Sequence, residues 1–495
     1  CQSVAMDKNT PVIVGVGQVL HRIADLDDVV EPLELMRRAC QKAEADTGVV
    51  LLDKIESLRV IRGMWAYNNP AAWLVSEFGC TGAETVGTLF GGNYNQVVLS
   101  DTAAQIQAGE RDLVLLTGAE IGYSSAKARK AGREIFMRET PKISYDHLYG
   151  TTQKPEHHDY EVAKGIRAAI HAYPLYDNAI RFARGETIPE HLERVSGLWS
   201  RFSRVASRNP NAWIREPVSA EDIRTPSANN RPVSFPYTKL MNSNNAVDMG
   251  AALIVCSLGK ARALGIDESR WVYPLAGVDG HDHFSASVRD NFYTSPGIRF
   301  IAERLYELTD TSADNIDLVD LYSCFPAAVQ VAAREYGFDE ARDLTVTGGL
   351  TFGGGPLNNY VMHSIARTVE LLREHRDQTA LVTANGGNLY KHAHGLYSGR
   401  PSDQPFARDN VQARIDALPS RNVLPTHTGD ARIESYTVIY GAGGPAIGHL
   451  ACLTEAGDRV WANVTDRDVL NAMPREEFCG RAVRLSGELP PQILD

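Results

Sequence analysis

The residues best suited to chemistry lie in three short segments of the second half of the chain. The first carries Tyr322 and Cys324, the second is the glycine-rich run 348–356, and the third is the turn 383–387. A tyrosine hydroxyl can donate to an oxyanion, or take a proton if its pKa is lowered, and a thiol can act as a nucleophile. Glycines let backbone N–H groups approach a ligand closely. The segments therefore indicate a ligand site, although tight strand-to-helix geometry would also explain many of these glycines.

Other reactive side chains favour structural roles. The run 390–394, Tyr-Lys-His-Ala-His, could face the site, but its alternating polar residues are more typical of a solvated strand. His281 and His283 have a spacing that suits a metal, yet no third ligand is evident, so no metal site is predicted. Cys324 is expected to be a small buried hydrophobe. The seven cysteines are scattered without a CxxC pair, which indicates neither zinc nor disulfides and favours a cytoplasmic location.

Composition narrows the class of function. The net charge is 50 − 61 = −11, which argues against nonspecific binding to nucleic acid or to an anionic membrane. No apolar run reaches the roughly 18 residues needed to span a bilayer. The 495 residues are too many for one compact core, so about two to four domains are expected.

The elements that must position these segments alternate between short apolar runs and helical patterns, which indicates an α/β fold with buried sheets. The two halves of the chain repeat this pattern, and the Gly-Gly-Asn turn at 91–93 has a counterpart at 353–355, so an internal duplication is expected. The expected elements are strands at 11–17, 112–118 and 379–383, and helices at about 32–44, 101–108, 189–208 and 359–375.

The order and spacing of these segments resemble the thiolase superfamily. Residues 109–120 are similar to the thiolase segment that follows the catalytic-cysteine helix, and residues 244–252 resemble its Asp-Gly-Ala-Ala segment. Residues 314–325 look like the approach to the Asn-Glu-Ala-Phe motif, in the His-Asp-Cys-Phe version of the sterol-carrier-protein thiolases. The resemblance covers about residues 10–398. It implies a duplicated five-layer αβαβα fold with an insertion domain, followed here by an additional antiparallel β-barrel that is OB-like.

The resemblance divides the chain into five parts. The expected parts are a first thiolase half at 6–121 and 241–270, an insertion at 122–240, a second half at 271–398, a linker at 399–430, and the C-terminal barrel at 431–495.

Thiolases use two cysteines, a histidine and an Asn or His side chain, and none of these types stands at the matching positions. The nucleophile position falls at Gly92, the histidine position at Gly355, the second cysteine position at Ala384, and the Asn/His position at Tyr322. The resemblance therefore implies a thiolase scaffold that lacks the cysteine acyl-enzyme reaction. Tyr322 is the candidate catalytic group, and the alternative is an aromatic ring that fills the vacated space.

The resulting hypothesis is a protein of lipid or acyl-CoA metabolism that binds CoA or acyl-CoA and needs no other cofactor. An alternative is an acyl-CoA enzyme, an acyltransferase or an aldolase-type C–C lyase, that uses Tyr322. A third is an interaction module with an empty pocket. Thiolases pair through the first half, so the resemblance implies a homodimer, although the added barrel leaves a monomer open. The residues expected to bind the ligand are Gly92, Asn93, Gly354, Gly355, Asn385 and Gly386.

Overall fold

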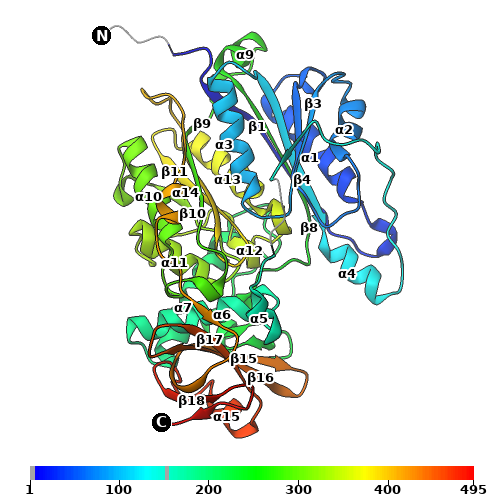
Figure 1. Ribbon diagram of the computed structural model, residues 1–495. Coiled ribbons are helices and arrows are strands. Elements are labelled where there is room, and N and C mark those ends of the chain that lie inside the picture. The colour runs from blue at the N-terminus through cyan, green and yellow to red at the C-terminus, as the bar shows by residue number, and fades with distance from the viewer. Residues whose placement is uncertain (1–5, 151–154) are drawn as a thin grey trace.

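Two mixed β-sheets lie at the centre of the computed structural model, which describes residues 6–150 and 155–495 (Figure 1). The first sheet has the strand order β1 (Pro11–Leu20), β8 (Asp248–Ser257), β4 (Leu113–Ile121), β2 (Ser57–Val60), β3 (Glu84–Thr88) and β5 (His147–Tyr149). The second has the order β10 (Leu318–Asp320), β11 (Thr379–Gly386), β12 (Lys391–Ser398), β9 (Tyr273–His281) and β13 (Ala407–Asn410). The predicted α/β class is confirmed.

The two sheets repeat one arrangement. Strand β1 runs antiparallel to β8, β8 antiparallel to β4, and β4 parallel to β2. In the second sheet, β9, β12, β11 and β10 follow the same succession of directions. The predicted internal duplication is therefore present in both sheets, and β13 is added beside β9 by a parallel pairing.

Helices separate the two sheets and cover their outer faces. Helices α3 (Tyr94–Gln107) and α13 (Tyr360–Glu374) pack between the sheets, where they share one hydrophobic core with strands of both. Helices α1 (Pro32–Thr47) and α2 (Pro70–Phe78) cover the first sheet, while α10 (Pro296–Thr309), with α11 (Pro326–Tyr336) beside it, covers the second. This is the predicted five-layer order (Figure 1).

Helix α3 begins at Tyr94 rather than near residue 101 as predicted. Its buried positions include Asn95, Gln96, Ser100 and Thr102 as well as apolar residues, because the helix is enclosed between two sheets. An enclosed helix shows no apolar stripe along one face, so the pattern that marks a surface helix is missing from its first turns.

Most of the insertion and the C-terminal sheet form the lower part of the molecule in Figure 1, whereas residues 122–130 lie beside the first half. The region 122–240 contains α4 (Gly122–Lys130), α5 (Asp159–Ala163), α6 (Ala169–Arg184), α7 (Ile188–Ser207), α8 (Ala220–Arg224), β6 (Pro232–Ser234) and β7 (Tyr237–Thr238). Helix α6 packs against β15 (Thr428–Gly441), and β6 pairs with the same strand. The insertion is therefore joined directly to the C-terminal sheet.

The third sheet is open in the order of its described strands. That order is β14 (Val423–Leu424), β17 (Arg459–Val464), β16 (Gly444–Thr454), β15, β18 (Ala482–Ser486) and β19 (Gln492–Ile493). No pairing joins β14 to β19 among the described residues, so a closed barrel stays a prediction. The C-terminal sheet itself is present and is antiparallel except for the parallel pairing of β14 with β17.

None of the described helices combines the length and the apolar character that crossing a bilayer requires. Within residues 6–150 and 155–495, no group of three or more His, Cys, Asp or Glu side chains is arranged to hold a metal ion.

Candidate functional site

The turn before α3 meets two of the predicted segments of the second half. A Cβ placed on Gly92 would stand 2.7 Å from the hydroxyl of Tyr322 and 2.5 Å from the carbonyl oxygen of Asn385. Real Cβ atoms do not approach other atoms so closely, so residue 92 has no room for a side chain. The positions matched to the nucleophile and to the Asn/His group of thiolases therefore come together, and the tyrosine hydroxyl fills the space between them.

Asn93 and Gly386 lie beside this contact. A Cβ on Gly386 would stand 2.6 Å from Oδ1 of Asn93 and 3.3 Å from Cδ of Lys391. Asn93 is buried and makes no side-chain hydrogen bond that caps α3. Its Oδ1, like that of Asn385, has no hydrogen-bond partner among the described residues. A buried oxygen without a partner calls for a physical explanation, such as an ordered water or a bound ligand.

The backbone and ring of Tyr322 are held in place, and its hydroxyl stays protonated near neutral pH. Its backbone N–H donates to Oγ1 of Thr383 at 2.8 Å, and its ring packs edge-on against Tyr360 at 5.8 Å between centroids. Part of its surface remains exposed, while burial of its hydroxyl raises the pKa of Tyr322 well above the ordinary value. A phenol in this state can donate to an oxyanion but does not act as a base near neutral pH.

Cys324 is also unsuited to be a nucleophile. Burial raises the pKa of its thiol to about 12, so the thiolate is not populated near neutral pH. The residue packs against the hydrophobic core, as expected for a small buried hydrophobe, but keeps part of its surface exposed. Ala384, at the second cysteine position, is fully buried within β11 and offers no reactive group.

The glycines of the second-half loop pack against the segment 243–249. The N–H of Gly355 donates to the carbonyl of Asn244 at 2.9 Å, and a Cβ on Gly354 would stand 2.6 Å from Sδ of Met249. The loop starts beside the tyrosine motif, because the N–H of Leu350 donates to Oγ of Ser323 at 3.1 Å. Tight packing alone therefore explains part of the glycine pattern, as the sequence allowed.

Sequence reasoning missed a residue of the insertion. Tyr173 of α6 is buried, stacks on Phe325 at 4.6 Å, and accepts a hydrogen bond from Nδ2 of Asn385 at 3.0 Å. Its own hydroxyl donates to the carbonyl of Gly387 at 3.3 Å. No signal in the sequence pointed to Tyr173, because its contacts with Phe325, Asn385 and Gly387 join residues more than 150 positions apart.

The interpretation of 390–394 as a solvated strand was wrong. Lys391, His392 and His394 are all buried in β12, which lies between β11 and β9 and is covered on both faces. His392 pairs with Asp282 at 2.7 Å, and His394 with the hydroxyl of Tyr336 at 2.6 Å. Alternating polar residues predict a solvated face only when one side of the sheet is open to solvent, and both sides of β12 are covered.

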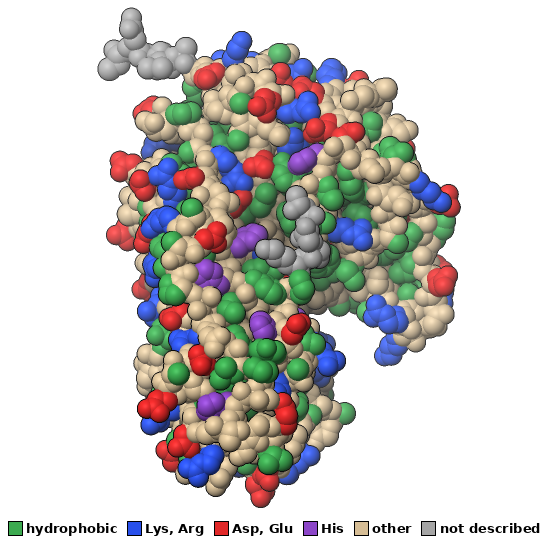
Figure 2. All heavy atoms as spheres, viewed as in Figure 1, with side chains coloured by type: hydrophobic (Ala, Val, Ile, Leu, Met, Phe, Trp, Pro, Cys, Tyr) green, Lys and Arg blue, Asp and Glu red, His purple; other side chains and the backbone are tan. Residues whose placement is uncertain are grey.

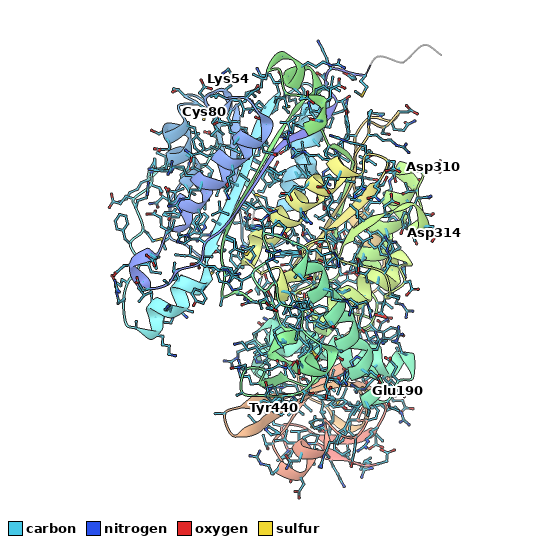
Figure 3. The ribbon with its side chains drawn as sticks, turned by 180° about the vertical axis from the view of Figure 1, so that it is seen from behind. Lys54, Cys80, Glu190, Asp310, Asp314 and Tyr440 are labelled. Atoms are coloured by element: carbon cyan, nitrogen blue, oxygen red, sulfur yellow. The ribbon has the colours of Figure 1, made fainter. Side chains whose placement is uncertain are left out.

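Cys80, the cysteine nearest in sequence to the nucleophile position, is remote from the site. It is buried just beyond the end of α2, where its thiol contacts the carbonyl of Val75 at 3.7 Å. Figure 3 shows it near Lys54 at the outer edge of the first half. Cys80 therefore does not replace the nucleophile.

A cavity of about 460 Å³ opens beside the segment that holds Gly355. Its wall includes Ser243, Asn244 and Thr351, together with apolar residues of the insertion, and the exposed cations Arg231 and Lys239 stand at it. Neither cation has an ion-pair partner among the described residues. Figure 2 shows the molecule hollowed between the first half and the insertion.

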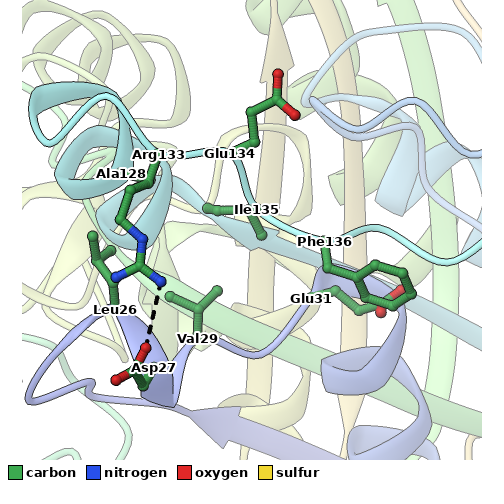
Figure 4. A pocket seen from close by; sticks show the side chains of 9 residues that line it. All are labelled: Leu26, Asp27, Val29, Glu31, Ala128, Arg133, Glu134, Ile135 and Phe136. Atoms are coloured by element: carbon green, nitrogen blue, oxygen red, sulfur yellow. Dashed lines mark hydrogen bonds and ion pairs between the residues drawn. The ribbon is translucent and has the colours of Figure 1, made fainter.

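Another cavity, of about 340 Å³, is remote from the glycine segments. It lies between residues 26–31 and 128–136, with Asp27 and Arg133 paired at 3.4 Å and the exposed Phe136 at its edge (Figure 4). It shares no lining residue with the predicted site, so it is not a candidate for the same ligand.

The fold and the matching positions define a protein of the thiolase superfamily, and comparison with known proteins agrees. Residues 410–488 match the family model described as the thiolase-like protein type 1 additional C-terminal domain. A monomeric SCP2-thiolase-like protein type 1 from Mycobacterium smegmatis is 29% identical, with a TM-score of 0.84 over 99% of this chain and 100% of that one. The chain belongs to the thiolase superfamily, on its SCP2-thiolase-like branch. Among curated proteins, none matches.

More distant structures share the fold. The Ltp2-ChsH2(DUF35) aldolase is 18% identical over 79% of this chain and 98% of that one, with a TM-score of 0.59. The dimeric peroxisomal thiolase of Saccharomyces cerevisiae is 14% identical over 80% of this chain and 98% of that one, with a TM-score of 0.55.

Proposed function

We propose that this protein binds CoA or an acyl-CoA in lipid or acyl-CoA metabolism and does not carry out the cysteine-dependent thiolase reaction. The contact of Tyr322 with Gly92 is the main evidence against the cysteine-dependent reaction. A thiolase needs a thiolate at the start of α3, and here that volume holds a tyrosine hydroxyl. The raised pKa of Cys324, which results from burial, argues against its thiol as a substitute.

The cavity beside Gly355 supports the binding of CoA or an acyl-CoA. Its volume of about 460 Å³ lies within the roughly 300–1,000 Å³ range of small-molecule sites. Its apolar wall, formed by residues such as Ile170 and Leu240, suits the pantetheine arm. Arg231 and Lys239 suit the phosphates, because cations form strong charge-assisted hydrogen bonds with phosphate oxygens.

Calorimetric titration of the protein with CoA and with butyryl-CoA tests this proposal. Saturable binding of either ligand is expected, with no release of acetyl-CoA when acetoacetyl-CoA and CoA are supplied together. Absence of binding up to millimolar ligand would overturn the proposal, and so would thiolytic cleavage that is lost on alkylation of a cysteine.

A second candidate function is an acyl-CoA reaction that uses Tyr322 as a proton or hydrogen-bond donor. The neutral state of its hydroxyl, which results from burial, favours this candidate, and the partly exposed surface of Tyr322 gives a ligand access. Acyl transfer and aldol cleavage of a β-hydroxyacyl-CoA both develop charge on a thioester oxygen. Turnover that is unchanged in Tyr322→Phe would eliminate this mechanism.

The edge of the first sheet supports a monomeric state. Strand β5 pairs in parallel with β3 and so covers the strand that would otherwise end the sheet. A second copy therefore cannot pair with β3 while β5 is in place. We propose a cytoplasmic monomer, a location in keeping with the six cysteines that are free among the described residues.

A further inference from the structure

The turn that follows β11 is held by three side chains from other parts of the chain. The consecutive carbonyls of residues 387–389 accept hydrogen bonds from the hydroxyl of Tyr173 at 3.3 Å, the hydroxyl of Tyr176 at 2.9 Å, and Nη1 of Arg289 at 2.8 Å. Leu389 has φ +63°, a conformation that non-glycine residues seldom adopt. Such a conformation persists when its surroundings fix it, and here they do so at three successive residues.

Arg289 is itself positioned by the C-terminal sheet. Arg459 of β17 is completely buried and pairs with Glu434 at 2.6 Å. Its Nη1 donates to the carbonyl of Ser287 at 2.8 Å and to the carbonyl of Arg289. One arginine of the C-terminal sheet therefore holds the backbone of the loop that carries Arg289.

Trp461 reaches the same loop from the same strand. Residues 459 and 461 are two positions apart, so both side chains leave β17 on one face. Nε1 of Trp461 donates to Oγ of Ser287 at 2.9 Å, and Ser287 donates to Oε1 of Glu161 at 2.6 Å. Glu161 of α5 is fully buried, so this second connection ties the loop to the insertion that supplies Tyr173 and Tyr176.

We propose that the C-terminal sheet is a positioning element of the ligand site. Arg459 and Trp461 fix the loop 285–290, and Arg289 with the two tyrosines then fixes the turn 387–389. That turn directly follows Asn385 and Gly386, so the clamp sets where both residues lie relative to Gly92. This assigns the C-terminal sheet a role beyond CoA binding itself.

The burial of both residues argues against a separate binding function for this face of the sheet. Arg459 is 0% and Trp461 is 3% exposed, so neither is available to a partner or ligand of its own. A buried arginine that donates to several carbonyls of one loop is well suited to holding that loop in a single conformation.

Hydrogen exchange measured by mass spectrometry on peptides covering 383–391 tests the proposal. Arg459→Met is expected to speed exchange of this turn at least tenfold, and Trp461→Phe and Tyr176→Phe, which each delete one hydrogen bond and keep a ring, at least threefold. The matched control is Arg373→Met. Arg373 is also largely buried, pairs with Asp46 at 2.8 Å and donates to the carbonyls of Val14 and Arg270, but it lies on α13 away from the turn.

The control is expected to lower stability without speeding exchange of the turn. Exchange that stays at the wild-type rate in Trp461→Phe and Tyr176→Phe would overturn the proposal, even if Arg459→Met does not fold. Equal acceleration in Arg373→Met would also overturn it. A separate measurement, of CoA affinity, rests on the proposed function and is expected to weaken at least threefold in Trp461→Phe. If the wild-type protein does not bind CoA, the proposed function fails, but the exchange result still decides whether the C-terminal sheet positions the turn.

Discussion

The hydroxyl oxygen of Tyr322 lies 2.7 Å from the point where a Cβ on Gly92 would stand. A single tyrosine therefore occupies the volume that a side chain at the start of α3 would require. The carbonyl of Asn385 closes the same space from a different direction, and a backbone oxygen cannot swing aside as a flexible side chain can. In this structure a cysteine at residue 92 would clash with both oxygens.

Gly92→Ala is expected to destabilise the protein by about 1–3 kcal/mol, because the added methyl group overpacks a closed space. Urea unfolding measures this. Adding Tyr322→Phe should restore part of the loss, since it removes one of the two clashing oxygens, and the remainder reports the Asn385 carbonyl. Gly443→Ala is the control, because nothing lies within 4 Å of its Cβ position. Equal losses at residues 92 and 443 would contradict the steric argument.

Replacing both Arg231 and Lys239 with methionine should weaken CoA binding about a hundredfold or more, because charge-assisted hydrogen bonds to phosphate contribute roughly 1.5–3 kcal/mol each. Pantetheine, which lacks the phosphates, should bind the double variant and the wild type equally. Calorimetry with both ligands measures the difference. Arg484→Met, at an exposed pair with Asp430 in the C-terminal sheet, should change neither affinity. Loss of pantetheine binding in the double variant would show that the two substitutions disturb packing and do not act through charge.

Stability should fall on acidification between about pH 6.5 and pH 4. Burial lowers the pKa of His363 to about 3 and that of His449 to about 4, whereas an unfolded histidine titrates near 6.5. The unfolded state therefore binds more protons in this window, so the free energy of unfolding rises with pH through it and is lost as pH falls. Urea unfolding at several pH values measures the slope.

A matched pair of variants assigns this acid sensitivity. His449→Gln should flatten the slope, because it removes one group that must be neutral in the folded state. His375→Gln, at an exposed residue, should leave the slope unchanged. Identical slopes in the wild type and in His449→Gln would rule out His449 as a contributor.

Asp146→Ala should release strand β5 from β3. The carboxylate of Asp146 accepts a hydrogen bond from the backbone N–H of Thr85 at 2.8 Å and so anchors β5 to its neighbour. An uncovered β3 exposes unpaired backbone groups, so concentration-dependent dimers are expected for the variant and a monomer for the wild type. Sedimentation velocity distinguishes the two states. The exposed Asp403→Ala serves as control, and a wild-type dimer with β5 in place would refute the role of this edge.

The thiolase-like framework could be predicted from the sequence because its signals are local. Strand β11, helix α13 and the three glycine-containing turns each lie in a short window of apolar periodicity and breakers. Their order also identified Gly92, Tyr322 and Ala384 as the matched positions. The burial of His392 and His394 could not be predicted, because it depends on which strands flank β12 and on the helices that cover it.

What the sequence by itself determined is the identity of the groups: which side chains are present at the matched positions, and that no cysteine is among them. Only the tertiary structure decided their relations. It placed the hydroxyl of Tyr322 against Gly92, and it brought Tyr173 and Arg289 to the turn at 387–389. Those contacts join residues that are 100 or more positions apart, and no local pattern of propensity or periodicity encodes such distances.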